Sequence, residues 1–340
     1  MQESAGPRLG ATLSPQGLKP PGDCDRPLER FIVERALAGT APGAHGDGRT
    51  IALVIEGGGM GGSVSAGMCL VLEALGLVNA FDMVVACSSG ALNGAWTAAG
   101  QSAQGTTNYI DLATREFMNP WRLAIGRAPI DFSLLFERVA VHRKPILAAG
   151  RAAGPRFFCL ATSVTTGKVR AFGDFKSNEE LLRAVRASCT LPVLGGPPIE
   201  IDGDRWVDGG LIESMPYASA FGLGATHALV LRSREAGYRK APYGRLELAV
   251  VRWKQRELLE GVRARPGLYN AEAQVLEDAM AAGREDLVQI TPSSAEDRVD
   301  QMERRHEKIT AGVRAGAAAA GKVFANEPVD VLWRPVAYTA

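Results

Sequence analysis

The sequence predicts a layered α/β fold, because two strand-to-helix junctions occur early and short apolar runs then alternate with helical patterns. Residues 51–55 form an uninterrupted apolar run, typical of a strand buried on both faces of a sheet. A glycine cluster separates this run from residues 63–75, whose apolar residues recur at near-helical spacing. A second run, 83–87, leads into the alanine-rich segment 91–99, which predicts a helix. Such alternation is typical of an α/β fold.

The alternation continues through the rest of the chain. Residues 157–161, 169–172, 228–231 and 287–290 predict further strands, and residues 178–189 predict a helix. Residues 199–208 predict a hairpin with a tight turn at 202–204. Patterns over 245–260, 270–282 and 298–324 predict helical additions toward the C-terminus.

Three parts are expected along the chain. Residues 1–48 are rich in proline and glycine, with little periodicity beyond residues 28–37, so we expect a flexible extension. Residues 49–235 contain both strand-to-helix junctions and form the expected core. Residues 236–340 form a helical region with one late strand, packed on that core.

Composition limits the partners and the compartment. Apolar residues make up 46% of the chain and charged residues 22%, which is typical of a globular protein. The formal net charge is +1, so we expect no nucleic acid as partner. The five cysteines are scattered without a CxxC pair, so we expect no metal site and a reducing cytoplasm. Since no segment approaches roughly 18 uninterrupted apolar residues, we expect a soluble protein, with transient contact with a membrane surface left open.

Residues 85–91 have the form of a nucleophile elbow, a sharp turn that presents a serine between a buried strand and a helix. The residues two before and two after the serine come close together there, so both must be small. Ala86 and Gly90 meet this requirement around Ser88. Ser89 is the poorer candidate, because Cys87 would then be a flanking residue. The short motif also fits a serine that only caps the next helix.

A glycine-rich loop, residues 56–62, lies between the first strand and the first helix of the core. Because residues without side chains expose their backbone N–H groups, the loop predicts a site for an anion or an oxyanion. The expected donors are Gly57, Gly58, Gly59 and Met60, with Gly62 in support. The same glycines fit the GxGxxG spacing of a dinucleotide-binding fold. That alternative requires an acidic residue at the end of the second strand, and Asp82 lies at its wrong end.

Asp208 follows the second strand of the predicted hairpin. Gly209 and Gly210 let the backbone turn sharply behind it and let another segment approach the carboxylate, which suits a catalytic base. Taken alone, Asp208 also fits a turn or a helix cap. Asp202 and Asp204 fit as turn formers.

Together, the three motifs resemble the patatin-like phospholipases, in which they occur in this order. The resemblance extends over residues 51–215 and includes segments 90–93 and 186–192. It implies a three-layer α/β/α sandwich with a mostly parallel sheet, a Ser88–Asp208 dyad in place of a triad, and hydrolysis of lipid acyl esters without a cofactor. Two positions depart from the family pattern, because Gly61 stands where the loop usually carries a basic residue and Ala86 replaces the first glycine of GxSxG. The missing basic side chain weakens the case for a phosphate head group more than the case for an ester.

The histidines agree with a dyad. A triad of the α/β-hydrolase order needs a histidine after the acid, near the active-site edge of the sheet. His227 precedes a predicted strand and is expected at the opposite edge, while His306 lies on a polar helical pattern. His45 falls in the extension and His142 in a basic loop. If Asp208 is the base, burial should raise its pKa.

Two further segments concern the substrate. Residues 117–136 are apolar and interrupted by Pro120 and Pro129, which fits an acyl-chain wall, an interfacial lid or ordinary core. A basic group after the strand 228–231 fits either acidic lipid head groups or a solvated loop: Arg232, Arg234, Arg239, Lys240 and Arg245. Three functions stay open: a lipid acyl hydrolase, which the motifs favour, a nucleotide-dependent oxidoreductase, and a catalytically silent module that binds lipid or protein.

Overall fold

Eight strands form one sheet in the computed structural model, which describes residues 9–11, 17–147, 152–329 and 331–333. The strands are ordered β6-β7-β4-β3-β2-β8-β9, and β5 pairs with β4. Parallel neighbours are β2 (Ile51–Ile55), β3 (Met83–Cys87), β4 (Arg156–Ser163), β8 (His227–Leu231) and β9 (Leu287–Ile290). Antiparallel pairs involve β5 (Val169–Phe172), β6 (Ile199–Ile201) and β7 (Asp204–Asp208). The predicted mostly parallel sheet is confirmed.

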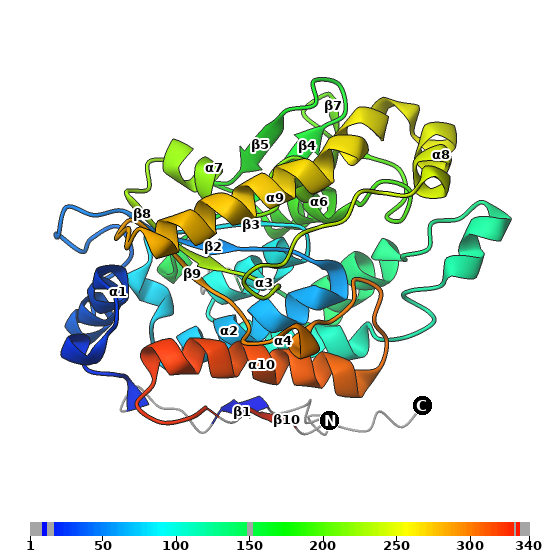
Figure 1. The fold of residues 1–340 in the computed structure, drawn as a ribbon. Helices are drawn as coiled ribbons and strands as arrows, with labels where there is room; N and C mark the ends of the chain where they lie inside the picture. Colours follow the sequence, from blue (N-terminus) through cyan, green and yellow to red (C-terminus); the bar gives the residue numbers. More distant parts are fainter. Residues whose placement is uncertain (1–8, 12–16, 148–151, 330, 334–340) are drawn as a thin grey trace.

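Helices cover both faces of this sheet and make three layers (Figure 1). Along β2, Leu53 and Ile55 join the larger buried cluster, whereas Val54 joins the cluster on the other face. This two-sided burial is the reason why the run contains no polar residue. The first face carries α2 (Ser63–Ala74), α3 (Ser89–Ala98), α4 (Ser102–Asp111), α6 (Asn178–Cys189) and α10 (His306–Phe324), and the second carries α7 (Tyr217–Gly222) and α9 (Leu259–Ala281).

Part of the N-terminal segment belongs to the folded body. The periodic patch forms α1 (Pro27–Ala38), in which Leu28 and Ile32 are fully buried. The buried Arg35 side chain donates to the carboxylates of Asp47 and Asp82, at 2.7 and 2.9 Å. Strand β1 (Leu9–Ala11) pairs with β10 (Val331–Trp333), so segments near the two ends of the chain meet. The division of the chain into three parts stays a prediction, and residues 1–8 and 12–16 of the expected extension lie outside the described residues.

The helical pattern over 245–260 does not form one helix. Helix α8 (Arg245–Lys254) ends before Gln255, and a short 3-10 turn (Arg256–Leu258) follows. The Gln255 side chain accepts from the Val193 N–H at 2.7 Å and donates to the Gly196 carbonyl at 3.0 Å. These bonds anchor the break to the loop 193–196.

The last two helices also begin elsewhere than predicted. Helix α9 starts at Leu259 rather than at residue 270 and continues through Pro266, although proline removes one backbone hydrogen bond. Helix α10 starts at His306 rather than at residue 298. Residues 298–305 instead turn toward the glycine-rich loop, where the Gln301 carbonyl accepts from the Met60 N–H at 3.0 Å.

Candidate active site

Ser88 occupies the turn between β3 and α3 in a strained conformation. Its φ is 56° and its ψ is −136°, which few residues other than glycine adopt. Gly90 must be small, because a Cβ there would lie 2.5 Å from the carbonyl oxygen of Ile55. Ser89 is the first residue of α3, and its φ is not among the positive values that mark Ser88. The backbone therefore singles out Ser88 as the elbow serine.

The end of α6 connects this elbow to Asp208. The Ser88 N–H donates to Oγ of Ser188 at 3.0 Å, and the Cys189 thiol donates to the Ser88 carbonyl at 3.0 Å. The next carbonyl, of Thr190, accepts from the Asp208 N–H at 2.9 Å. Segment 186–192 thus holds both sides of the predicted dyad, a role that the sequence did not reveal.

Asp208 ends β7 beside β4 and is fully buried. One carboxylate oxygen, Oδ1, accepts from the Gly210 N–H at 2.7 Å, while Oδ2 has no hydrogen-bond partner among the described residues. Burial raises the pKa of Asp208, although the positive charge of Arg265 and the nearby Ser88 hydroxyl oppose this rise. The direction is the one expected of a base, and Oδ2 remains open to a proton.

The glycine-rich loop packs directly on Ser88. A Cβ on Gly57 would lie 2.6 Å from the Ser88 Cβ, so only glycine fits there. Gly58 and Gly59 have φ values of 155° and 60°, and their N–H groups have no hydrogen-bond partner among the described residues. The Met60 N–H, in contrast, already donates to Gln301.

The other predicted donor, Gly57, also has a partner. Burial raises the pKa of the Cys87 thiol, and a hydrogen bond from the Gly57 backbone opposes this rise. Asn93 holds the far side of the loop, because its amide donates to the Gly62 carbonyl at 2.9 Å. Of the four expected oxyanion donors, Gly58 and Gly59 are therefore the two with open N–H groups.

Ala86 and Gly209 fill the remaining motif positions. Ala86 lies in β3 and is fully buried. A Cβ on Gly94, one turn into α3, would approach the Ala86 Cβ to 3.3 Å, so a small residue at 86 lets α3 pack closely on β3. Gly209 lies directly over the Leu160 carbonyl, where a side chain would clash. Both positions support the backbone around the site.

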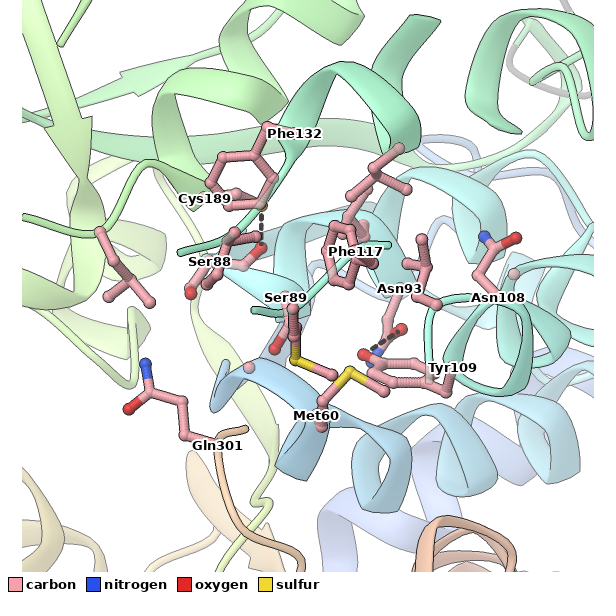
Figure 2. A pocket seen from close by; sticks show the side chains of 18 residues that line it. Met60, Ser88, Ser89, Asn93, Asn108, Tyr109, Phe117, Phe132, Cys189 and Gln301 are labelled. Atoms are coloured by element: carbon pink, nitrogen blue, oxygen red, sulfur yellow. Dashed lines mark hydrogen bonds between the residues drawn. The ribbon is translucent and has the colours of Figure 1, made fainter. Parts of the chain in front are cut away.

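An apolar cavity of about 60 Å³ opens on one side of Ser88 (Figure 2). Phe117 and Phe132 face it in the figure, and Met60 and Tyr109 lie on the opposite side. The apolar segment 117–136 supplies much of its wall: Phe117, Met118, Ile130, Phe132 and Leu135. Trp121 and Ile125 of the same segment are instead exposed. The segment is therefore partly a cavity wall and partly surface.

A polar cavity of about 200 Å³ opens on the other side of Ser88. Three cationic side chains line it, from Arg234, Lys240 and Arg265. Glu56 is the carboxylate on its wall and accepts from the Tyr269 hydroxyl at 2.7 Å. Aromatic rings and the glycine-rich loop supply much of the remaining lining: Tyr238, Tyr243, Tyr269, Gly57, Gly58 and Gly59.

The five basic residues that follow β8 lie in different environments. Arg232 is fully buried, with its Nε 3.8 Å from Glu56. Arg239 lies at the surface and pairs with Glu277 at 2.7 Å, and Arg245 is exposed. Only Arg234 and Lys240 line the cavity, where they meet Arg265. Neither predicted interpretation holds for the whole group, and the sequence offered no signal for Arg265, which comes from α9.

None of the histidine side chains that the structure describes lines either cavity. His227 pairs in register with Ile51, at the start of β2, so it lies at the edge of the sheet opposite Ser88. His45 lies against Asp82, and His306 is exposed at the start of α10. The side chain of His142 lies outside the described residues.

The described residues contain neither the acid expected of a dinucleotide site nor a cluster that could bind a metal ion. Asp82, the nearest acid to β3, precedes that strand and binds Arg35 instead of lying near the glycine-rich loop. Within the described ranges, no group of three or more histidine, cysteine or acidic residues is arranged to hold a metal ion. The dinucleotide hypothesis thus lacks its ribose-binding acid in the structure as well.

Comparisons with known proteins agree with the resemblance. The family model described as patatin-like phospholipase matches residues 53–221. The uncharacterized protein YjjU of Escherichia coli (strain K12) is 30% identical over 190 residues, which are 54% of this chain and 52% of that protein. The chain thus spans about half the length of this curated relative.

Two solved structures are similar at low sequence identity. The crystal structure of VipD from Legionella pneumophila has a TM-score of 0.46 and 12% identity, over 81% of this chain and 66% of that chain. Human GIVD cytosolic phospholipase A2 in complex with methyl gamma-linolenyl fluorophosphonate has a TM-score of 0.45 and 13% identity, over 86% of this chain and 60% of that chain.

Proposed function

Because residues 53–221 belong to the patatin-like phospholipase family, we propose that the chain is a lipid acyl hydrolase with Ser88 as nucleophile and Asp208 as base. The observation that carries this proposal is the strained Ser88 beside a buried carboxylate whose Oδ2 is open. Ser88 also borders an apolar and a polar cavity, which suits an ester with an apolar acyl chain.

The proposed reaction passes through an acyl-enzyme. The Ser88 Oγ attacks the ester carbonyl carbon as its proton moves to Oδ2 of Asp208. The N–H groups of Gly58 and Gly59 hold the resulting oxyanion, and each such donor contributes about 3 kcal/mol to lowering the barrier. The bond to the alkoxy oxygen then breaks, and Asp208 returns the proton to the leaving alcohol. Water, activated by Asp208, releases the acid in the same way.

The rival function is a catalytically silent module that binds lipid or protein. Turnover of a medium-chain p-nitrophenyl ester and labelling by a fluorophosphonate decide between the two, because both require an activated serine. We expect the purified protein to do both. A folded protein that is neither labelled nor active would favour the binding module.

The apolar cavity predicts a preference for acyl-chain length. Ile130→Trp places a larger side chain in its wall and is expected to lower kcat/KM for a long-chain ester about tenfold relative to a butyrate ester. Ile125→Trp is the matched control, since Ile125 is 70% exposed and does not line the cavity. A series of p-nitrophenyl esters measures the effect. An unchanged length profile in a folded Ile130→Trp protein would place the acyl chain elsewhere.

We include peripheral membrane contact in the proposal. Trp121 and Trp253 are 83% and 76% exposed, and Leu246 of α8 is 84% exposed. The loop 193–196 lies between their segments. It makes hydrogen bonds with the Gln255 side chain, just after α8, and with the backbone of Ile130, just after the turn Pro120–Ile125 that contains Trp121. Exposed aromatic residues next to arginines suit an anionic lipid surface. Within the described residues, no helix is long and apolar enough to cross a bilayer.

This contact predicts the result of a vesicle-binding assay. Trp121→Ser with Trp253→Ser is expected to weaken binding to phosphatidylglycerol vesicles about tenfold or more, because the apolar area lost is no longer buried in lipid. Leu37→Ser is the control, since Leu37 is 63% exposed on α1, at the end of the molecule away from α8 (Figure 1). Equal binding of the double variant and wild type would exclude this surface.

A further inference from the structure

Several of the groups beside Asp208 carry no charge. Ser88 faces it from the elbow, and the thiols of Cys87 and Cys189 lie within its electrostatic reach, at the end of β3 and at the end of α6. Burial raises the pKa of both thiols well above the usual range, so they stay neutral. Because a buried carboxylate takes up a proton more readily than an exposed one, the site needs a cation that keeps Asp208 ionised.

The nearby acids cannot supply that charge. Beyond burial, the charges of Glu272 and Glu213 also raise the pKa of the Cys87 thiol, so both acids act on the region of Asp208. Glu272 accepts from the Ser214 N–H at 3.0 Å, and burial, with the charge of Glu213, raises the pKa of Glu272 to about 8. Since these groups are either neutral or anionic, the stabilising charge must come from a basic residue.

Arg265 of α9 provides a positive charge at the turn behind Asp208. Its Nε donates to the Gly210 carbonyl at 2.9 Å, and the N–H of the same Gly210 donates to Oδ1 of Asp208 at 2.7 Å. A Cβ on Gly210 would lie 3.0 Å from Oδ1 of Asp208 and 3.7 Å from Nη2 of Arg265. The carboxylate and the guanidinium therefore border the same α-carbon, and Gly210 connects them through its two backbone groups.

Neutral acceptors hold the Arg265 side chain in this place. Its Nη1 donates to the Tyr243 hydroxyl at 3.2 Å, so that hydroxyl and the Gly210 carbonyl fix two sides of the guanidinium fork. Among the described residues, both hydrogen bonds of this guanidinium go to uncharged groups. Such acceptors orient a guanidinium without cancelling its charge, so the charge of Arg265 acts on Asp208.

Lys240 is the other cation that acts on Asp208, and its charge is not constant. Burial, together with the charge of Arg265, lowers the pKa of Lys240 to about 7. Near neutral pH, Lys240 is therefore deprotonated in part of the molecules, whereas a guanidinium keeps its proton. Arg265 is thus the permanent positive charge beside the proposed base.

We propose that Arg265 is a positioning residue of the reaction, which orients Asp208 through Gly210 and keeps its carboxylate charged. With Oδ1 of Asp208 fixed by the Gly210 N–H, Oδ2 is left for the proton of Ser88. The inference rests on the proposed hydrolase function, because Arg265 acts through the base of that reaction. Arg265 itself lies outside residues 53–221, the part that the family model matches.

The first test removes the charge and records the pH dependence of ester hydrolysis. Arg265→Gln leaves an amide that can still donate to the Gly210 carbonyl, and Arg265→Met repeats the change without a donor. Because the pKa of Asp208 should rise without the guanidinium, the increase of kcat/KM with pH is expected to move upward by about one pH unit in both variants. The shift stays moderate, since the loss of Arg265 also ends its repulsion of Lys240, which then keeps its proton to higher pH.

Two further variants complete this test. Arg265→Lys keeps the charge but not the fork that reaches both Gly210 and Tyr243, so the pH profile should stay near that of wild type while kcat falls about tenfold through poorer orientation of the carboxylate. Arg263→Met is the matched control, because Arg263 is exposed on the same helix and pairs with Glu260 at 2.7 Å. It should leave both the profile and kcat unchanged. Profiles of Arg265→Gln and Arg265→Met that coincide with that of wild type would overturn the proposal.

A double-mutant cycle separates this role from general damage to the fold. At a pH below the midpoint of the wild-type rise, Arg265→Gln is expected to lower kcat/KM about tenfold in wild type. In Asp208→Asn it should lower kcat/KM less than about twofold, because asparagine has no charge for Arg265 to preserve. Equal losses in the two backgrounds would show that Arg265 does not act through Asp208 and would reject the positioning role while the hydrolase stands. A wild-type protein that hydrolyses no ester would reject the hydrolase and this role together.

Discussion

Ser88→Ala is expected to lower kcat for ester hydrolysis by at least about 10⁴-fold and to abolish fluorophosphonate labelling. The loss should be this large because no other described hydroxyl sits on the strained turn with an open carboxylate beside it. The backbone of the elbow should survive, since its bonds to Ser188 and Cys189 involve main-chain atoms of residue 88. Initial rates and intact-protein mass measure both effects.

Ser89→Ala is the matched control for this experiment. Ser89 neighbours the nucleophile in sequence and is equally hidden from solvent, but it begins α3 with ordinary helical geometry. Its hydroxyl interacts with Tyr109 and not with Asp208, so its removal should change kcat little. Labelling that persists in Ser88→Ala and disappears in Ser89→Ala would reassign the nucleophile.

Asp208→Asn is expected to lower kcat by about 10³- to 10⁴-fold. The amide oxygen of asparagine can still accept from the Gly210 N–H, so the loop keeps its anchor while the side chain loses its basicity. Asp204→Asn is the matched control, because Asp204 lies on the same hairpin and its carboxylate accepts from Ser163 and Thr165 at the surface. Equal losses in both variants would indicate damage to the hairpin and not the loss of a base.

We also expect wild type and Asp208→Asn to differ in the pH dependence of kcat/KM. A base must be deprotonated, so kcat/KM of wild type should rise as pH increases through the pKa of Asp208. Burial raises that pKa, which places the rise above the pH range of an exposed aspartate. The residual activity of Asp208→Asn should lack this rise. A wild-type profile that is flat down to the range of ordinary aspartates would contradict the assignment.

The sequence predicted those parts of the molecule that depend on residues close together in the chain. The run 51–55 reads as a doubly buried strand because both faces of a parallel strand are covered, and Ser88 is identifiable because a tight elbow admits only small flanking residues. Arg265 and Gln301 could not be found in this way. Both residues lie at the site because α9 and the loop before α10 pack beside the glycine-rich loop. A local sequence pattern does not predict such a contact between segments that are far apart in the chain.

The wrong helix boundaries have the same origin. Residues 298–305 have a helical pattern, yet the backbone bond from Met60 to Gln301 and the buried Val299 favour a loop. The pattern that predicted a helix began only at residue 270, yet α9 starts at Leu259 and continues through Pro266, with Arg265 anchored on Gly210 and Tyr269 buried against Glu56. Tertiary contacts outweigh local preference at both places.

Arg234, Lys240, Arg265 and Gln301 all come from outside residues 53–221, the part that the family model matches. The proposed reacting groups and the charged lining of the polar cavity beside them thus come from separate stretches of the chain. Evolution can exchange most of the second stretch while the first is left intact. We therefore expect homologues that share the elbow and its acid to differ in substrate when their sequences differ after the motif that contains Asp208.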